Sequence, residues 1–372
     1  MNDQTKPDRA DAKVPPVWLV RIVSAFRDSL ENLRRRLAPP QVALLEQTLS
    51  FWHTQAIYVA AKLAVADHLR DGPRSIAELA TATGTHAPSL YRLMRALASI
   101  GVFAEDKSGR FALTPMAGAL LTDAPHSIRA IAIMTGEDWW WRAWGQIHFS
   151  VQTGKSSFER VHGMRFFDYM EKNPEAGAVF DQAMSAYTGQ TAVQVATAYP
   201  FHEAAILVDV GGGGGTLIST ILAHHAQLRG IIYDLPATVE AAKQLLQSRG
   251  LSSRCQVLGG DFFEAIPEGG DTYLLQHVIH DWDDEHAKKI LKNCHQAMPP
   301  NGKLLLVEMV IPSGNKPFLG KFLDLGVLMM ESGARERTEL EYRTLLSAAG
   351  FDVRKIRALP SPDSLIEAVP GS

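Results

Sequence analysis

A run of five glycines follows a short apolar stretch in the segment LVDVGGGGGT, residues 207–216. A dinucleotide-binding loop needs glycines at i, i+2 and i+5, and no start within this run places glycine at the third of these positions. A triphosphate-binding loop needs Gly-Lys-Ser/Thr, and no lysine lies near the run. The pattern that fits is G-x-G-x-G at Gly211, Gly213 and Gly215, after the acid Asp209. The neighbouring segments must therefore decide which cofactor the glycines admit.

Acids end the next two strand-like segments. RGIIYD ends in Asp234, about where a ribose-binding acid follows a glycine loop. CQVLGGD ends in Asp261, whose carboxylate suits an exocyclic amine, and Phe262 offers a face on which a purine can stack. Strands also often end in aspartate as a simple turn residue. Two such acids beside a glycine loop without phosphate chemistry favour an adenosine that lacks its phosphates.

A histidine follows the strand-like segment TYLLQHVI. His280 is expected at the carboxyl end of this strand, and Asp281 is expected to cap a helix that begins near Trp282. A lone histidine is more often structural than catalytic, but this position lies beside the predicted cofactor site. His277, three residues earlier on the strand, is predicted to point to the opposite face, so the two histidines should not chelate a metal.

These residues need a sheet to bring them together. From about residue 205, the strand-like runs AAILVDV, RGIIYD, CQVLGGD, TYLLQHVI and KLLLVEMVI alternate with helical segments. This alternation predicts an α/β fold, a doubly wound parallel sheet with helices on both faces, over residues 201–372. Ligands of such sheets bind outside the carboxyl ends of the strands.

The N-terminal part is predicted to be mainly helical. Residues 1–40 are expected to form a tail and one extra helix, and residues 41–125 a winged helix-turn-helix, from SIAELATATGTHAPSLYRLMRALASIG and the two short strands of VFAEDKSGRFALT. DNA binding is one function of this motif. Residues 75–113 carry four basic and three acidic residues, a balance that attracts phosphates weakly and favours a dimerisation module.

Residues 126–200 are predicted to continue as helices rich in aromatic residues and methionine. Within them, Phe180, Met184 and Tyr187 lie at i, i+4 and i+7 and so share one helix face. Such a stripe could line a core or a flat apolar ligand.

Composition limits the class of protein. At 372 residues the chain is long enough for two or three domains, and its net charge of −3 gives no footprint for nucleic acid. The two cysteines, Cys255 and Cys294, fit a reducing compartment. No run reaches the roughly 18 apolar residues of a membrane span, and no signal sequence begins the chain. We expect a soluble cytoplasmic protein that binds neither nucleic acid nor membranes.

Five segments together resemble the class I S-adenosylmethionine-dependent methyltransferases, and more closely the small-molecule O-methyltransferase family: LVDVGGGGG, YDLP, GGDFFEAIPEGGDTYLLQHVIHDWDDEHAKKIL, LLLVEMVIP and ESGARERTELEYRTLLSAAGF. The resemblance covers nearly the whole chain, since family members carry an N-terminal winged-helix dimerisation domain. It implies a Rossmann-like sheet, S-adenosylmethionine as cofactor, no metal and a homodimer. The cofactor contacts that it implies are Asp209, Gly211, Gly213, Gly215, Asp234, Leu235, Asp261, Phe262, Gln276 and Trp282.

The same resemblance implies a catalytic set. In the family the histidine of HDW deprotonates the acceptor hydroxyl, and His280 matches it. A neutral imidazole, with a pKa near 6.5, can accept a proton that a phenol, with a pKa near 10, rarely loses unaided. Glu308 and Glu336 match the supporting acids, although a sheet-edge ion pair and a surface charge are the alternatives. Gln276 stands where plant members carry lysine, which puts that cofactor contact in doubt.

By family position, Phe180, Met184 and Tyr187 face the acceptor, with Met329 and Met330 opposite. Aromatic and methionine side chains suit a planar phenolic or polyketide-like molecule.

Two other functions stay open at this point. Some bacterial relatives keep the cofactor site but act as hydroxylases, decarboxylases or pericyclases, often without the histidine. A ligand-sensing regulator built on the winged helix is disfavoured by the charge balance. The resemblance also raises the hypothesis that residues 1–40 swap across the dimer.

Overall fold

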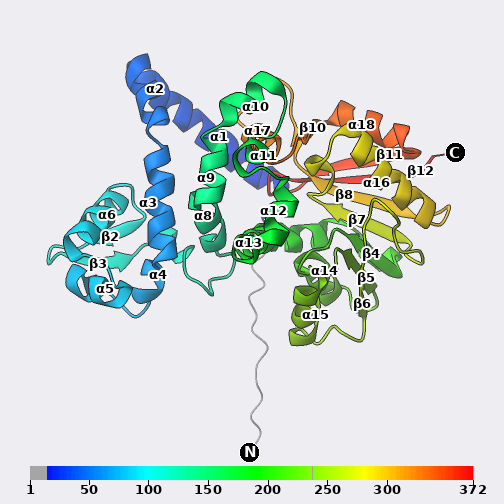
Figure 1. The fold of residues 1–372 in the computed structure, drawn as a ribbon, viewed down its shortest axis with the longest axis horizontal. Helices are drawn as coiled ribbons and strands as arrows, with labels where there is room; N and C mark the ends of the chain where they lie inside the picture. The colour runs from blue at the N-terminus through cyan, green and yellow to red at the C-terminus, as the bar shows by residue number, and fades with distance from the viewer. Residues whose placement is uncertain (1–14, 237, 372) are drawn as a thin grey trace, which may run out of the picture.

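The computed structural model describes residues 15–236 and 238–371. The chain runs from an N-terminal helical arm through a winged-helix unit and a group of short helices to a large α/β unit that holds the C-terminus (Figure 1). Most of the predicted polar tail, residues 1–14, lies outside the described residues. No helix in the described ranges combines the length and the apolar composition of a membrane span.

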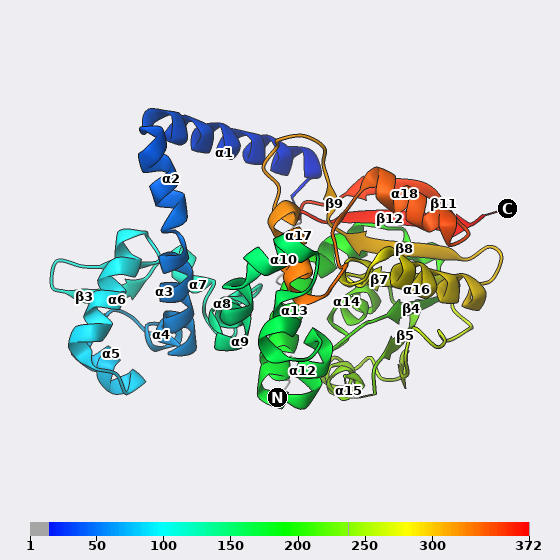
Figure 2. The ribbon, with the colours of Figure 1, turned by 45° about the horizontal axis from the view of Figure 1, so that its top comes forward.

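The arm consists of α1 (Val17–Leu37) and α2 (Pro40–Thr48). Proline has no backbone N–H, so the pair Pro39-Pro40 interrupts the helix, and Pro40 takes the first position of α2, where no donor is needed. Neither helix contains a buried residue. Figure 2 shows α1 projecting from α2 as an arm. The extra helix predicted within residues 1–40 is present as α1.

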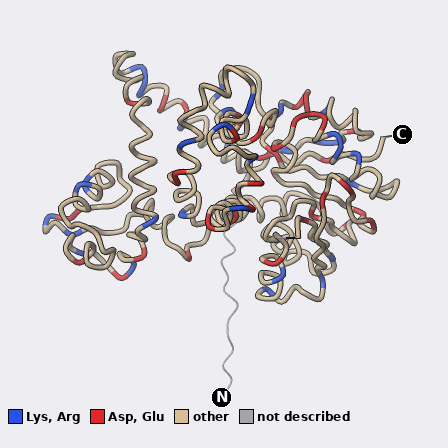
Figure 3. Tube along the Cα trace, viewed as in Figure 1, with Lys and Arg blue, Asp and Glu red and all other residues tan. Residues whose placement is uncertain are grey.

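A winged helix follows the arm. Its elements are α3 (Phe51–Lys62), α4 (Val65–His68), β1 (Arg74–Ser75), α5 (Ile76–Thr83), α6 (Ala87–Ser99), β2 (Phe103–Glu105), β3 (Arg110–Leu113) and α7 (Pro115–Gly118). Ser75 and Glu78 form a capping box that starts α5, and Gly84, with a left-handed backbone, ends it. The predicted helix-turn-helix and wing are confirmed, and Figure 3 shows charges of both signs on this unit.

Short helices connect the winged helix to the sheet. They are α8 (Arg129–Gly136), α9 (Asp138–Trp144), α10 (Ile147–Thr153), α11 (Ser157–His162), α12 (Phe166–Lys172) and the long α13 (Pro174–Ala198). Most of their aromatic residues form one hydrophobic cluster that also contains Met329 and Met330 of α17 (Gly320–Met330). The helical region therefore shares a core with α17 of the α/β unit.

The large sheet has seven strands in the order β11-β12-β8-β7-β4-β5-β6. They are β4 (Ile206–Val210), β5 (Arg229–Asp234), β6 (Cys255–Gly259), β7 (Thr272–Gln276), β8 (Lys303–Glu308), β11 (Phe351–Ala358) and β12 (Ser364–Pro370). Strands β4 to β8 are parallel, as predicted. Strands β11 and β12 were not predicted, and both pair antiparallel. Strand β11 (FDVRKIRA) lies at the edge of the sheet, where charged residues are common. These charges obscure the alternation of apolar and polar residues by which a strand is recognised.

Helices cover both faces of the sheet. One face carries α13, α14 (Thr216–His224) and α15 (Val239–Ser248), and the other carries α16 (Asp284–Ala297) and α18 (Glu339–Ala348). Along β8, Leu305 and Val307 pack into the core beneath α13, α14 and α15, whereas Leu304 and Leu306 pack into the core beneath α16 and α18. This alternation explains why the central strands are apolar on both faces, as parallel strands require.

The strand before His280 is shorter than predicted. Strand β7 ends at Gln276, His277 has a left-handed backbone with φ 52°, and the 3-10 turn Ile279–Asp281 carries His280. A turn rather than a strand end therefore presents His280.

We predict that Leu306→Ala lowers the free energy of unfolding by about 3 kcal/mol, because it leaves a cavity in a core that this side chain fills without exposure. Leu340→Ala, at a position that is 73% exposed, should change it by less than about 0.5 kcal/mol. Urea unfolding followed by circular dichroism measures both. Equal effects of the two substitutions would contradict the core assignment.

Candidate active site

The glycine loop joins β4 to α14. Its predicted glycines all have left-handed backbones, with φ of 71° at Gly211, 54° at Gly213 and 77° at Gly215. A Cβ on Gly211 would lie 2.7 Å from a methyl of Val278, and one on Gly215 would lie 2.8 Å from the end of Ile232. Nothing lies within 4 Å of the same position on Gly213. Two glycines thus permit close packing, and the third faces open space that a ligand can fill.

Asp234, at the end of β5, reaches back to this loop. Its Oδ2 accepts a hydrogen bond from Gly213 N at 2.7 Å, and its Oδ1 accepts one from Leu235 N at 2.6 Å. Burial raises the pKa of Asp234, and these bonds act against that rise. Leu235 is 50% exposed beside it. The acid and the exposed leucine form the polar and apolar parts of one surface, as a nucleoside requires.

Asp209 is buried beneath the loop and is only 1% exposed. A Cβ on Gly212 would lie 2.9 Å from its carboxyl carbon. Burial, and then repulsion from Asp234, raise the pKa of Asp209 to about 7. This position supports the loop from below, and a direct contact with the cofactor stays a prediction.

An aromatic wall stands at the carboxyl ends of the strands. The ring of Trp282 lies 6.1 Å from that of Phe262 and 4.7 Å from that of Phe263, and stacks at 6.0 Å on Phe167 of α12. Asp261 accepts a hydrogen bond from Phe263 N at 2.8 Å and is otherwise exposed. An apolar face and a free carboxylate therefore lie together, as predicted for the adenine end of the cofactor.

Gln276 has another partner. Its Nε2 donates to Thr191 Oγ1 of α13 at 2.8 Å, which ties the end of β7 to that helix. The predicted contact between Gln276 and the cofactor stays a prediction.

A cavity of about 390 Å³ opens beside the glycine loop. It is lined by Gly214 of the loop, by Asp181 and Ser185 of α13, and by Arg129 and Thr238. Burial, and then the charge of Asp234, raise the pKa of Asp181. The size is within the range of ligand pockets, roughly 300–1,000 Å³. Backbone and side-chain polar groups on this cavity could hold the charged end of an amino-acid cofactor.

His280 is buried against two carboxylates. Its Nδ1 lies 2.8 Å from Glu336 Oε1 in a hydrogen bond, and 3.7 Å from Glu308 Oε2. Glu308 also accepts from Ile279 N at 3.0 Å, which fixes the turn that carries the histidine. His280 and Glu336 are 6% and 4% exposed, and Glu308 is fully buried. The alternatives of a surface charge and a sheet-edge ion pair are therefore wrong.

Burial raises the pKa of both glutamates, that of Glu336 to about 8, and the neighbouring histidines act against this rise. A buried carboxylate is costly unless it faces a positive charge. Proton uptake by His280 would create such a charge between the two acids.

The predicted helix cap was placed wrongly. Asp283, not Asp281, caps α16 by accepting from His286 N at 2.9 Å. The carboxylate of Asp281 lies 3.5 Å from His280 Nε2 instead, and burial raises its pKa to about 7. The 3-10 turn delays the start of the helix by two residues.

The prediction that His277 points to the opposite face is also wrong. Because β7 ends before it, strand alternation does not apply, and its ring centroid lies 5.0 Å from that of His280. Donor atoms of His277, His280 and Glu336 lie within 4.8 Å of one another. Glu336 already binds the ring of His280, so we assign the cluster to proton chemistry. That no metal takes part stays a prediction.

Arg337 is fully buried behind this turn. Its guanidinium donates to the carbonyl oxygens of Ile279 and Trp282 at 2.9 and 2.8 Å, and to Asp284 at 2.9 Å. It follows Glu336 directly and pairs with Val310 in the short ladder of β9 (Val310–Ile311) and β10 (Arg337–Thr338). One residue thus anchors both the histidine turn and the glutamate.

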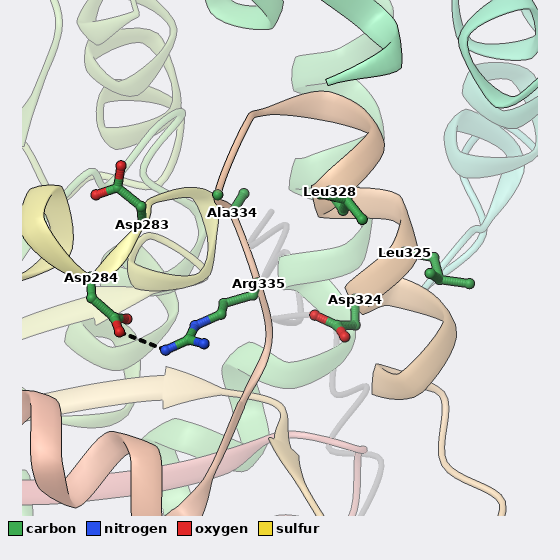
Figure 4. A pocket seen from close by; sticks show the side chains of 8 residues that line it. Asp283, Asp284, Asp324, Leu325, Leu328, Ala334 and Arg335 are labelled. Atoms are coloured by element: carbon green, nitrogen blue, oxygen red, sulfur yellow. Dashed lines mark hydrogen bonds and ion pairs between the residues drawn. The ribbon is translucent and has the colours of Figure 1, made fainter. Parts of the chain in front are cut away.

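A second cavity, of about 420 Å³, lies between α16, α17 and the segment before Glu336 (Figure 4). Arg335 crosses it to reach Asp284 at 2.6 Å, and its backbone N donates to His280 O at 2.9 Å. Asp324 lines the cavity and accepts from Glu336 N at 2.9 Å. The cavity therefore backs directly onto the segment that carries Glu336.

The predicted acceptor residues separate into two groups. Phe180, Met184, Met329 and Met330 belong to one hydrophobic cluster, with Met329 fully buried. Tyr187 instead places its ring 5.2 Å from that of His277. None of the five lines either cavity described above, so their contact with an acceptor stays a prediction.

Comparison with known proteins identifies the family. The sequence profile of the O-methyltransferase domain matches residues 144–352, and that of the O-methyltransferase dimerisation domain matches residues 45–123. This chain belongs to the O-methyltransferase family. It is an S-adenosylmethionine-dependent O-methyltransferase, as the glycine loop and the HDW segment led us to expect.

Relatives of this O-methyltransferase are enzymes of natural-product biosynthesis. The phenazine O-methyltransferase PhzM of Lysobacter antibioticus is 45% identical over 340 residues, which cover 91% of this chain and 99% of that protein. The crystal structure of LaPhzM superposes with a TM-score of 0.86 at 45% identity, over 90% of this chain and all of that one. The neocarzinostatin enzyme NcsB1, solved with S-adenosylmethionine and a hydroxynaphthoic acid, gives 0.73 at 34% identity, over 86% and 96%.

Sequence reasoning missed two residues of the O-methyltransferase site. Asp363, whose Oδ1 lies 3.1 Å from His277 Nε2, comes from the turn between the two strands that were not predicted. Arg337 lies within the ARERT motif, where a charge suggests surface. The signal available for it was its position directly after Glu336.

We predict that Asp209→Asn makes the free energy of unfolding of the O-methyltransferase fall less as the pH rises from 5 to 8. A raised pKa means that the folded chain holds the Asp209 proton more tightly than the unfolded chain, so stability is lost as the pH rises through about 7. The stability of the variant relative to wild type should increase by about 2 kcal/mol between pH 5 and pH 8.

Urea unfolding at both pH values, without cofactor, measures this difference. Asp138→Asn, at a side chain that is 81% exposed, serves as control and should give no such change. An equal pH response in both variants would disprove the assignment.

Proposed function

We propose that this enzyme transfers the methyl group of S-adenosylmethionine to a phenolic hydroxyl of a planar aromatic molecule, with His280 as general base. The observation that carries the proposal is the buried hydrogen bond of 2.8 Å between His280 Nδ1 and Glu336 Oε1. A histidine that donates from Nδ1 presents the lone pair of Nε2 to the acceptor. Glu308 and Glu336 orient the ring and stabilise its charged form.

The reaction balances without a further reactant. His280 Nε2 takes the hydroxyl proton, the oxygen forms a bond to the methyl carbon, and the carbon–sulfur bond breaks to leave neutral S-adenosylhomocysteine. Attack joins an anion to a cation, so positioning and exclusion of water supply much of the acceleration. The cofactor residues are those of the glycine loop, Asp234, Leu235, Asp261, Phe262 and Trp282, and no metal is needed.

The acceptor class rests on shape and on relatives. The cluster around Phe180 and Met184 offers aromatic and methionine surface, which suits flat rings. The names of the relatives include a phenazine O-methyltransferase and a naphthoate 7-O-methyltransferase. One relative is named as a riboflavin-type N,N-dimethyltransferase, so aromatic amines belong in any acceptor panel. We place the enzyme in the cytoplasm, in a biosynthetic pathway.

We predict that His280→Ala lowers methyl transfer at pH 7 by about 10²- to 10⁴-fold, because it removes a general base. Activity should partly return near pH 10, where a phenol ionises unaided. Transfer from labelled S-adenosylmethionine to hydroxyphenazines, hydroxynaphthoates and aromatic amines, with a chelator present throughout, measures this effect. His202→Ala, at an exposed position, is the matched control. Full activity of His280→Ala at pH 7 would refute the assigned base.

We further propose a homodimer in which a second copy of the chain covers the arm. The dimerisation profile begins at residue 45, and α1 precedes it with no buried residue. Its exposed apolar residues include Trp18, Ile22, Phe26 and Leu33, which share one helix face. Continuity with the dimerisation region favours a second copy as the cover for this face.

Deletion of residues 1–40 should weaken the dimer, as should Ile22→Glu with Phe26→Glu, because each removes apolar surface from the interface. Light scattering coupled to size-exclusion chromatography over a dilution series measures the dimer mass. Ser24→Glu, which adds one negative charge off this face, should leave the mass unchanged. A deletion variant that stays dimeric at every dilution would count against the role of the arm.

A further inference from the structure

A second histidine lies in the active site and has no part in the reaction described above. His277 follows β7 with a left-handed backbone, φ 52°, and its N donates to Val307 O at 3.1 Å. This conformation is costly for a residue other than glycine, and it tends to persist where it serves a site. Here it turns the side chain of His277 toward His280 rather than across the sheet.

The imidazole of His277 meets a carboxylate of its own. Its Nε2 lies 3.1 Å from Oδ1 of Asp363, which is 1% exposed in the turn between β11 and β12. The pairing of Ser364 with Glu308 across β12 and β8 fixes this turn beside the catalytic acids. No lysine or arginine among the described residues lies within ion-pair distance of Asp363. His277 is therefore its cationic partner.

The groups that face His277 come from every element around it. They are Tyr187 of α13, Asp363 of the β11–β12 turn, Glu308 at the end of β8, His280 and Asp281 of the 3-10 turn, and Glu336 before β10. Its Nδ1 lies 4.0 Å from Glu308 Oε2. Burial alone would lower the pKa of His277, but Asp363, Glu308 and Glu336 outweigh burial and raise it to about 9.

The base must be neutral before it can take a proton. At that stage Glu308 and Glu336 are buried carboxylates beside an uncharged His280, and Asp363 is a third buried carboxylate beside His277, so the cluster carries several negative charges, which is costly. Without a nearby cation, this cluster of carboxylates and His280 would keep one bound proton up to a higher pH. That proton would occupy either His280 or the glutamate bound to it, and the base would be blocked.

We infer that His277, held by Asp363, is a positioning residue that supplies the permanent positive charge of the active site and so lowers the affinity of the His280–Glu336 pair for its proton. The inference rests on the proposed function of His280 as general base. His277 transfers no proton itself, and it acts through the charge it places beside the catalytic pair.

The test compares three variants by the pH dependence of kcat/KM. His277→Asn removes the cation and keeps a side chain that tolerates a left-handed backbone. We expect the acidic limb of its profile to move upward by about one pH unit or more, since the charge lies only a few ångströms away. The double variant with Asp363→Asn removes cation and anion together and should return the limb close to wild type. His202→Gln, at an exposed position, should leave it unmoved.

A second measurement needs no acceptor. Titration of the histidine ring signals by nuclear magnetic resonance, in chains labelled at the ring carbon, should show the His280 signal moving at higher pH in His277→Asn and at the wild-type pH in the double variant. Binding of S-adenosylhomocysteine and the melting temperature confirm that each variant is folded.

Each outcome decides one proposal. An acidic limb and a His280 signal that stay unmoved in a folded His277→Asn variant would overturn the inference and leave the proposed function intact. A double variant as impaired as His277→Asn would assign His277 to packing alone, and would also overturn it. If the wild-type enzyme methylates no acceptor, the proposed function fails, and the ring titration still decides whether His277 sets the proton affinity of the cluster.

Discussion

The guanidinium of Arg337 holds together the parts of the active site that the sheet alone would leave apart. A 3-10 turn has few hydrogen bonds of its own: without Arg337 the carbonyl of Trp282 would lose its donor, and that of Ile279 would keep only the long bond of 3.4 Å from Trp282 N. The cation is fully buried, which is costly, but carbonyl oxygens and Asp284 accept from it on several sides. The orientation of His280 therefore depends on a side chain that never contacts it.

Four separate segments meet at this point, and each arrives by its own constraint. Glu308 comes at the end of β8, and Glu336 is brought beside it because β10 pairs in register with β9. Asp363 arrives with the antiparallel hairpin at the sheet edge. Burial opposes the ionisation of Glu308 and Glu336, so the acids and the histidines must balance one another's charge. The methyltransferase site is thus an electrostatic cluster built on a hydrophobic sheet.

Much of this arrangement follows from local sequence, and the rest does not. Glycine spacing and strand-end acids predict a glycine loop with Asp234 beside it, and the left-handed backbones of Gly211, Gly213 and Gly215 and the bond from Gly213 N to Asp234 follow that pattern, because this geometry depends on a few adjacent residues. The direction in which His277 points depends on its left-handed backbone just after β7. The alternation of side chains along a strand cannot predict such an angle. The position of Asp363 depends on the pairing of β12 with β8, which ends more than fifty residues earlier in the chain. Tertiary contacts decide such positions, and propensity carries little information about them.

The N-terminal arm has a consequence for how this protein can change over evolutionary time. Because no side chain of α1 or α2 is buried within its own chain, substitutions there leave the folding of the single subunit almost untouched. Selection can act on Trp18 or Phe26 only through whatever contacts them. The arm and the catalytic sheet are thus free to diverge at different rates, and partner choice can drift while the chemistry stays fixed.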